Sequence, residues 1–137
     1  MKKYDHKSLE QLEKDIWPAP DYPSYLVTTC HELRKKKLSD FTAEDLRIMI
    51  GQSIGLRYLL PKAIEFLQED PFCQGDFYQG DLLMALTRLP AGQLPVDKCF
   101  KYDLIEILLA ALSSDAPKLS KADRTTVNQL LERISTH

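Results

Sequence analysis

The chain has 137 residues, of which 44% are hydrophobic and 28% are charged, and its formal net charge is −2. This length is enough to bury a core without disulfides or metal, so we expect one domain over residues 1–137. The nearly balanced charge gives no general attraction to nucleic acid or to anionic lipid.

Cysteine usage and the absence of long apolar runs indicate a cytoplasmic protein. Cys30, Cys73 and Cys99 form no CxxC pair, and one would stay unmatched if the other two were joined. The first seven residues are polar, unlike a secretion signal. No run approaches the roughly 18 to 20 apolar residues that a membrane span requires. We therefore expect reduced thiols and no membrane association.

The first predicted helix runs from Leu9 to about Asp15, because Ser8 and Gln11 have the spacing of a capping box. Residues 17–23, WPAPDYP, cannot continue it, since proline lacks an N–H donor and biases the preceding residue away from the helix. We expect an extended connector that carries aromatic residues.

Two more helices are predicted between residues 24 and 50. Apolar residues recur at intervals of three and four from Ser24, before the cations of residues 34–37, which suit a helix C-terminus. Residues 25–29 are rich in strand formers, and a strand is the less favoured alternative there. Thr42 is the predicted N-cap of the next helix. The predicted apolar faces are Leu26, Val27, Cys30 and Leu33, then Leu46, Met49 and Ile50.

The stretch 50–61, IGQSIGLRYLLP, places two glycines and a proline inside an apolar helical pattern. A phosphate-binding loop needs G-x-x-x-x-G-K-[ST] after a strand, so that backbone N–H groups and a lysine surround phosphate. This stretch has another spacing, lacks the lysine and follows a predicted helix. We interpret the glycines as sites of close packing or of a bend, and expect the helix reaching Leu67 to restart or kink at Pro61.

The second half of the chain also reads as helices joined by loops. Residues 71–80 form a turn-rich aromatic loop, and Asp81 is the predicted N-cap of a helix over 82–89. A helix over 101–112 is apolar nearly all round and is predicted to be central. Ser120 starts the last helix, whose apolar stripe is Val127, Leu130, Leu131 and Ile134. No segment alternates with period two, so the predicted fold is all-α, a compact bundle of about six or seven helices.

The sequence offers no complete catalytic or metal-binding motif. His31 and Glu32 begin like H-E-x-x-H, but Lys35 stands where the second imidazole is needed to share one metal. His31 is also the one histidine far enough from the termini to serve as a catalytic base. Nucleophilic catalysis is not excluded, but we expect a protein that is not an enzyme and that has no metal or cofactor.

Two charged segments are candidate interaction sites. The cations Arg34 to Lys37 would suit a nucleic-acid backbone, but four charges that end a helix are more typical of a solvated face. The segment 62–81 has five acids and one lysine, and its acids are interleaved with Phe72, Phe77 and Tyr78. Acids around exposed aromatics suit docking on a basic protein surface. The alternative is that these residues cap helices and pack onto the core: Glu65, Glu69, Asp70, Phe72, Asp76, Phe77, Tyr78 and Asp81.

Several motifs resemble the immunity proteins of bacterial contact-dependent growth inhibition systems. They are SLEQLE at 8–13, WPAP at 17–20, YPSYL at 22–26, DFTAEDLRIMIGQ at 40–52 and GDFYQGDLL at 75–83. The resemblance covers roughly the first two thirds of the chain, and the 40–52 motif is the most specific. It implies a small helical cytoplasmic protein that binds and blocks the C-terminal toxin domain of its own kind of effector. Such toxins are commonly nucleases with basic substrate-binding faces.

The resemblance gives the acidic and aromatic segment a hypothetical role as the toxin-binding surface. The candidate contact residues are Glu69, Asp70, Asp76, Phe77 and Tyr78, in a 1:1 complex between a monomer and the toxin domain. Residues 17–25 are a second candidate surface, unless their aromatics hold the first helix to the bundle. Two other interpretations stay open: a helical regulatory adaptor, and a nucleic-acid-binding module that uses Arg34 to Lys37.

Overall fold

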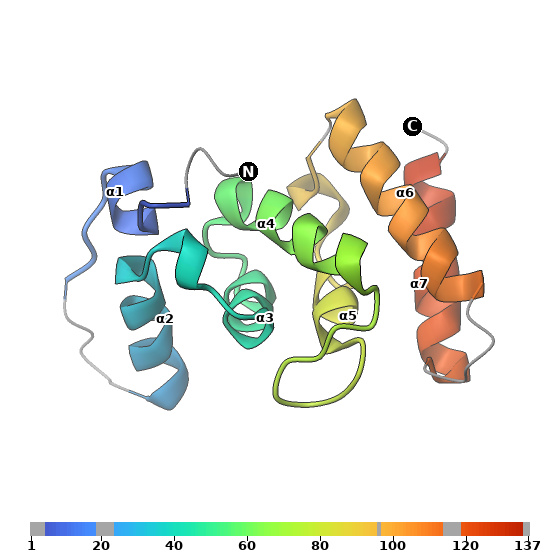
Figure 1. The fold of residues 1–137 in the computed structure, drawn as a ribbon, viewed down its shortest axis with the longest axis horizontal. Coiled ribbons are helices and arrows are strands. Elements are labelled where there is room, and N and C mark those ends of the chain that lie inside the picture. Colours follow the sequence, from blue (N-terminus) through green and yellow to red (C-terminus); the bar gives the residue numbers. More distant parts are fainter. Residues whose placement is uncertain (1–4, 19–23, 96, 114–118, 136–137) are drawn as a thin grey trace.

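The computed structural model describes residues 5–18, 24–95, 97–113 and 119–135, and this part of the chain is all-α (Figure 1). It contains no strand, and an isolated antiparallel bridge joins Gln74 to Gln79. None of its helices is long and apolar enough to cross a membrane. The seven α-helices of the described residues are α1 (Leu9–Glu13), α2 (Tyr25–Lys35), α3 (Ala43–Gly51), α4 (Leu56–Glu69), α5 (Asp81–Thr87), α6 (Lys98–Ser113) and α7 (Lys121–Ser135).

The helices α3, α4 and α5 form the middle of the molecule, with α1 and α2 at one end and α6 and α7 at the other (Figure 1). α3 packs against α4 and α5, while α6 packs against α4 and α7. The predicted apolar face of α3, Leu46, Met49 and Ile50, is buried as expected. This arrangement confirms the predicted helical bundle.

The predicted starts of α1, α2 and α3 are confirmed by hydrogen bonds. Ser8 and Gln11 form the expected capping box, and Thr42 forms a second one with Asp45. Ser24 accepts the backbone N–H of Val27, which starts α2 as a helix, so the alternative of a strand at 25–29 is wrong. Each cap supplies an acceptor for an N–H group that has no partner within its helix.

The glycines of the 50–61 stretch form a bend between α3 and α4, as predicted. Gly55 adopts a left-handed backbone with φ of 65°, and a Cβ there would lie 2.7 Å from Cδ1 of Leu9. Glycine is therefore required both by conformation and by the close approach of α1. Gly51 meets no such neighbour. α4 begins at Leu56 and passes through Pro61, so the helix does not restart at the proline, and the alternative of a kink there stays a prediction.

Two predictions about the later helices are wrong. α6 was expected to be central, but it lies at one end, and Leu109 is 48% exposed. Among the described helices its main contacts are with α4 and α7, and the face that carries Leu109 stays open to solvent. The N-cap of α5 is Gly80, with φ of 88°, rather than Asp81. Asp81 is instead the first helical residue, and its carboxylate turns back toward the preceding loop.

The basic segment 34–37 is not a uniformly solvated face. Arg34 is 1% exposed and binds the carboxylate of Glu13 and the carbonyl of Asp15. Its guanidinium also lies 4.2 Å from the ring centroid of Trp17, and this contact ties the start of the connector to α2. Lys36 forms a 2.6 Å ion pair with Asp45. Two of the four cations, Arg34 and Lys36, therefore bind groups of the same chain.

The rest of the connector, residues 19–23, lies outside the described residues, so the structure does not place the second candidate surface as a whole. Within the described ranges, no group of three or more His, Cys, Asp or Glu side chains is arranged to hold a metal ion.

Candidate functional site

The loop of residues 71–80 leaves the end of α4 and returns to the start of α5. Its two ends are held together, since the N–H of Gly80 donates to the carbonyl of Phe72 at 3.1 Å. At the first turn, the Asp70 carboxylate accepts the N–H of Phe72 at 2.9 Å. The Phe72 side chain is buried and packs on the core. The loop is therefore closed at its base and anchored by an aromatic ring.

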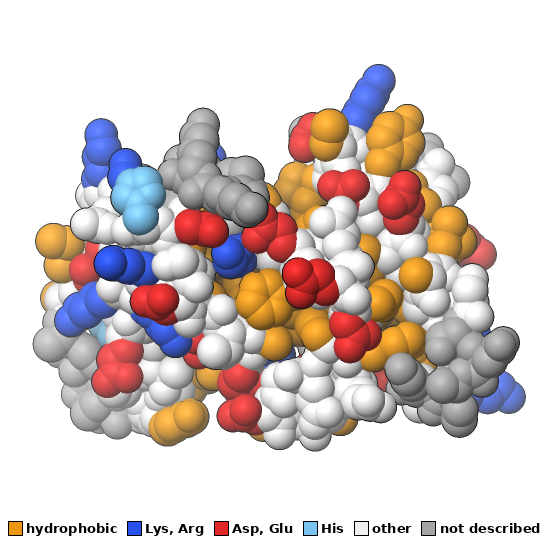
Figure 2. All heavy atoms as spheres, viewed as in Figure 1, with side chains coloured by type: hydrophobic (Ala, Val, Ile, Leu, Met, Phe, Trp, Pro, Cys, Tyr) orange, Lys and Arg blue, Asp and Glu red, His pale blue; other side chains and the backbone are white. Residues whose placement is uncertain are grey.

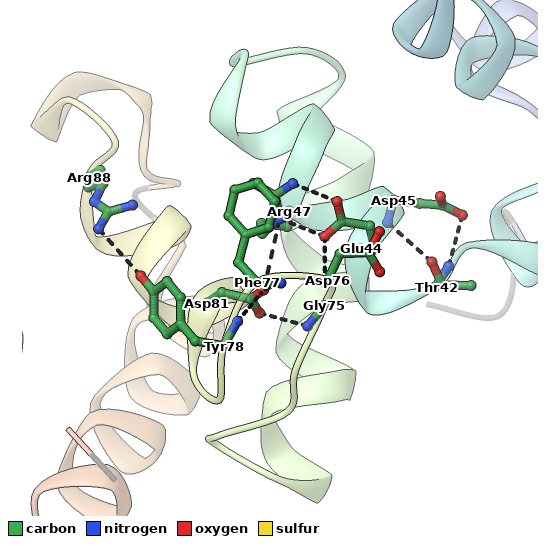
Figure 3. Close-up of polar contacts among 10 residues, drawn as sticks. All are labelled: Thr42, Glu44, Asp45, Arg47, Gly75, Asp76, Phe77, Tyr78, Asp81 and Arg88. Atoms are coloured by element: carbon green, nitrogen blue, oxygen red, sulfur yellow. Dashed lines mark hydrogen bonds and ion pairs between the residues drawn. The ribbon is translucent and has the colours of Figure 1, made fainter. Parts of the chain in front are cut away.

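The side chain of Asp81 holds the backbone of the 71–80 loop. Its carboxylate is 2% exposed and accepts three backbone N–H groups, from Gly75 at 2.7 Å, Phe77 at 3.1 Å and Tyr78 at 3.4 Å (Figure 3). Its position in the first turn of α5 also suits a negative charge. Hydrogen bonds to an ionised acceptor are stronger than neutral ones, so this single side chain fixes the path of the loop.

The loop is also held from α3, through Glu44. The Glu44 carboxylate accepts the Arg47 Nε–H at 2.6 Å and the backbone N–H of Asp76 at 2.9 Å (Figure 3). The hydrogen bond from Arg47 lowers the pKa of Glu44, against the opposing effect of burial. The approach is so close that a Cβ at Gly75 would lie 2.5 Å from the Glu44 carboxylate and 3.1 Å from its Cα. A side chain at position 75 would therefore displace the Glu44 carboxylate that holds the loop.

Phe77 and Tyr78 project from this fixed backbone. Phe77 is 69% exposed, and the Arg47 guanidinium lies 4.0 Å from the centroid of its ring. The Tyr78 hydroxyl accepts a long hydrogen bond of 3.4 Å from Arg88. The arginine contact orients the Phe77 ring while leaving much of it open to a partner, because a guanidinium stacks on an aromatic face.

A hollow of about 330 Å³ lies beside these two rings, between the loop, α3 and α5. We call it the loop hollow. Its charged lining residues are Arg47, Asp81 and Arg88, and the carboxylate of Asp81 is already occupied by the loop N–H groups. Its lining contains no histidine and no cysteine. The aromatic rings and guanidinium groups of this lining are groups that can bind a partner.

The structure divides the five predicted contact residues into two groups. Phe77 and Tyr78 line the loop hollow. Asp76 is exposed next to them, on the side of the loop that Glu44 holds. Glu69 and Asp70 are exposed at the end of α4 and do not line the hollow. These two acids therefore lie at the start of the loop, before the chain reaches the aromatic residues.

Some acids of the 62–81 segment serve the fold itself. Glu65 lies 3.5 Å from Lys62, whose ammonium group also lies 3.2 Å from Asp5. Asp81 is buried, and Asp70 caps a turn through its side chain. The alternative interpretation, in which these acids cap and pack, thus holds for part of the segment.

Sequence reasoning missed the contributions of Glu44, Arg47 and Arg88 to the site. They come from α3 and from the C-cap of α5, and nothing in their local pattern indicates that the loop returns to them. Glu44 lies in the first turn of α3, where an acid ordinarily matches the helix dipole. The structure shows that Glu44 is also the acceptor that holds Asp76.

A family model described as CDI immunity proteins, where CDI is contact-dependent growth inhibition, matches residues 11–104. The chain belongs to the CDI immunity protein family. The match covers well over half of the chain and contains the whole 71–80 loop together with α3 and α5. No individually curated protein matches the chain. Membership makes this chain a toxin-neutralising immunity protein whose partner is a cognate toxin protein.

Proposed function

We propose that this immunity protein acts in the cytoplasm by binding a nuclease toxin domain of its cognate effector in a 1:1 complex, and that it catalyses no reaction. The proposed contact surface consists of Glu69, Asp70, Asp76, Phe77 and Tyr78. The observation that carries the proposal is the fixed loop that presents Phe77, an exposed aromatic ring, beside a hollow. Family membership supports the choice of a toxin as the partner.

The rigidity of the loop favours tight binding. Association loses free energy when flexible segments must be ordered, and a loop already fixed by Asp81 and Glu44 avoids much of that loss. Aromatic residues are enriched among the few residues that contribute most of an interface's binding energy. Phe77 is suited to such a role, because a partner that covers it buries a large apolar ring.

The acids near the loop favour a basic partner. Glu69 and Asp76 are exposed, and neither forms an ion pair with another described residue. A nuclease must bind phosphate, and its substrate-binding face therefore tends to be basic. Acidic side chains on the immunity protein would steer this face toward the loop and increase the association rate at low salt.

Growth rescue tests the proposal directly. The toxin domain of the neighbouring effector gene is expressed in bacteria with this chain, and wild-type immunity protein should restore growth. Phe77→Ala, and separately the double reversal Glu69→Lys with Asp76→Lys, should reduce the rescue. Asp70 is left unchanged because its carboxylate caps the turn at Phe72.

Matched controls separate the loop from the rest of the surface. Tyr102→Ala removes an aromatic side chain of similar exposure, 63%, from α6. Glu132→Lys reverses an exposed acid of α7. Both controls should protect as well as the wild type. If the wild-type chain fails to restore growth, the proposed function is wrong. If the wild type restores growth and the loop variants protect as well as the controls, the proposed contact surface is wrong.

A further inference from the structure

A second recessed surface runs along the seam between α4 and α6, on a different part of the molecule from the loop hollow. It consists of three adjoining hollows of about 420, 360 and 370 Å³. The first two share Pro61, Asp97 and Phe100, and the second and third share Gln68. We call this continuous depression the α4–α6 groove.

The floor of the α4–α6 groove is apolar. Leu60, Ile64 and Leu67 of α4 and Phe100 and Ile107 of α6 line it, and all five belong to the buried core. Short side chains stand at its edges, including Pro61 and Ala110. Leu60 and Leu67 are fully buried beneath them, and Ile64, Ile107 and Phe100 keep only 3 to 8% of their surface exposed. The apolar surface open to a partner therefore comes mainly from half-buried Pro61 and exposed Ala110.

The rim of the α4–α6 groove is acidic. Among the described residues, four carboxylates line it, those of Glu65, Asp97, Asp103 and Glu106, and Arg57 at one end is the one Lys or Arg that does so. Figure 2 shows the same contrast on this face: Asp and Glu side chains lie among hydrophobic ones over α4 and α6, while Lys and Arg gather mainly over α1 and α2. Apart from Arg57 at one end, the charged side chains found in the groove lining are therefore acidic, and they lie beside apolar surface.

The two acids of α6 on this rim have no countercharge among the described residues. Asp103 and Glu106 lie one helical turn apart, and neither forms an ion pair in this part of the chain. Neighbouring like charges on a helix face destabilise the helix slightly. Asp97 differs, because its carboxylate accepts the N–H groups of Cys99 and Phe100 and so serves the start of α6.

We propose that the α4–α6 groove binds a segment of the toxin domain in which apolar side chains alternate with lysine or arginine. The apolar side chains would cover the floor, and the cations would pair with Asp103 and Glu106 on the rim. This inference rests on the proposed function, and it adds a second contact surface that lies apart from the 71–80 loop. Charge complementarity selects a basic segment over an acidic or purely apolar one.

Calorimetric titration of the purified toxin domain into the full chain tests the groove. The groove variant is Asp103→Lys with Glu106→Lys. The control is Glu32→Lys with Glu132→Lys, which changes the net charge equally at exposed positions on α2 and α7. The groove variant should raise the Kd at least about 30-fold, whereas the control should change it less than about threefold. The salt dependence of the Kd should also decrease in the groove variant.

A second variant tests the groove without a change of charge. Gln68 is exposed and lines two of the three hollows, so Gln68→Trp should fill the middle of the groove. It should weaken toxin binding at least about tenfold, by blocking the floor to the partner. Thermal unfolding followed by circular dichroism verifies that each variant keeps its helices, so that a loss of binding is not a loss of fold.

The outcomes distinguish this inference from the proposed function. If the wild-type chain does not bind the toxin domain, the proposed function itself fails. If the wild type binds and the groove and control variants change the Kd equally, the groove is not a contact surface. If sedimentation shows that the chain alone dimerises and that Gln68→Trp abolishes the dimer, the groove is occupied by a second copy and the inference is overturned.

Discussion

Replacing Asp81 by Asn tests the claim that one buried carboxylate holds the 71–80 loop. In the wild type, Oδ1 of Asp81 accepts the N–H of Gly75, and Oδ2 accepts those of Phe77 and Tyr78. An asparagine side chain keeps one acceptor oxygen, and its NH₂ group then faces N–H donors. At least one set of loop hydrogen bonds must be lost.

The expected loss follows from these contacts. A hydrogen bond to a charged group contributes about 1.5 to 3 kcal/mol, and the substitution removes at least one well-formed bond of this kind. The attraction to Arg47, whose Nε lies 3.9 Å from the carboxylate, is also reduced. Asparagine is neutral, so the free-energy cost of burying the Asp81 charge disappears, and this gain offsets part of the loss. We expect Asp81→Asn to lower the free energy of unfolding by about 2 to 3 kcal/mol.

Urea unfolding at pH 7 measures this difference, and Asp76→Asn is the matched control. Asp76 is exposed, and no hydrogen bond of its carboxylate to a described residue is observed, so its substitution should change the free energy by less than about 0.5 kcal/mol. Hydrogen exchange should also become faster at the backbone N–H groups of Gly75 and Phe77. The reasoning is refuted if Asp81→Asn is as stable as the control and exchange at these groups is unchanged.

Three further predictions concern other parts of the molecule. Gly55→Ala should lower the free energy of unfolding by about 2 kcal/mol or more, whereas Gly51→Ala should leave it unchanged or raise it. Of these two glycines, only Gly55 combines a positive φ with a close neighbour. Equal effects of the two substitutions in urea unfolding would contradict this reasoning. The pKa of Glu44 is lowered in the folded protein, so the Glu44 carboxylate stabilises the fold above pH 4.5, its ordinary pKa, and this stabilisation is lost as the pH falls below that value. The destabilisation caused by Glu44→Gln should therefore shrink in acid. A difference in unfolding free energy that does not change with pH would count against the contact with Arg47. Partial burial raises the pKa of Cys73 to about 11, so iodoacetamide at pH 8 should modify exposed Cys99 well before Cys73. Mass spectrometry of the labelled peptides measures both rates, and faster modification of Cys73 would contradict its raised pKa.

Local chemistry made much of the helical architecture predictable. The caps at Ser8, Ser24 and Thr42 act over three residues, so the sequence alone is sufficient to locate them. The position of α6 was not predictable in this way. Its sequence shows that apolar residues occupy most of its faces, but it does not show how many neighbouring helices cover those faces. The exposure of Leu109 is a property of the packing.

The candidate site was predicted only in part, and for the same reason. The loop and its aromatic residues were recognisable from composition, and Phe77 and Tyr78 do project from it. The groups that fix and flank the loop, Glu44 and Arg47, lie about thirty residues earlier in the chain. The α4–α6 groove likewise joins helices separated by a long segment. Such sites depend on tertiary contacts that helical periodicity does not determine.

The central claim is that this immunity protein neutralises its toxin by direct binding, and titration of the two purified proteins combined with a nuclease assay tests it most directly. We predict a 1:1 complex with a Kd of about 10 nM or tighter, and loss of nucleic-acid cleavage at equimolar immunity protein. No measurable binding at about 10 µM, or cleavage that persists with the immunity protein in excess, would contradict the account.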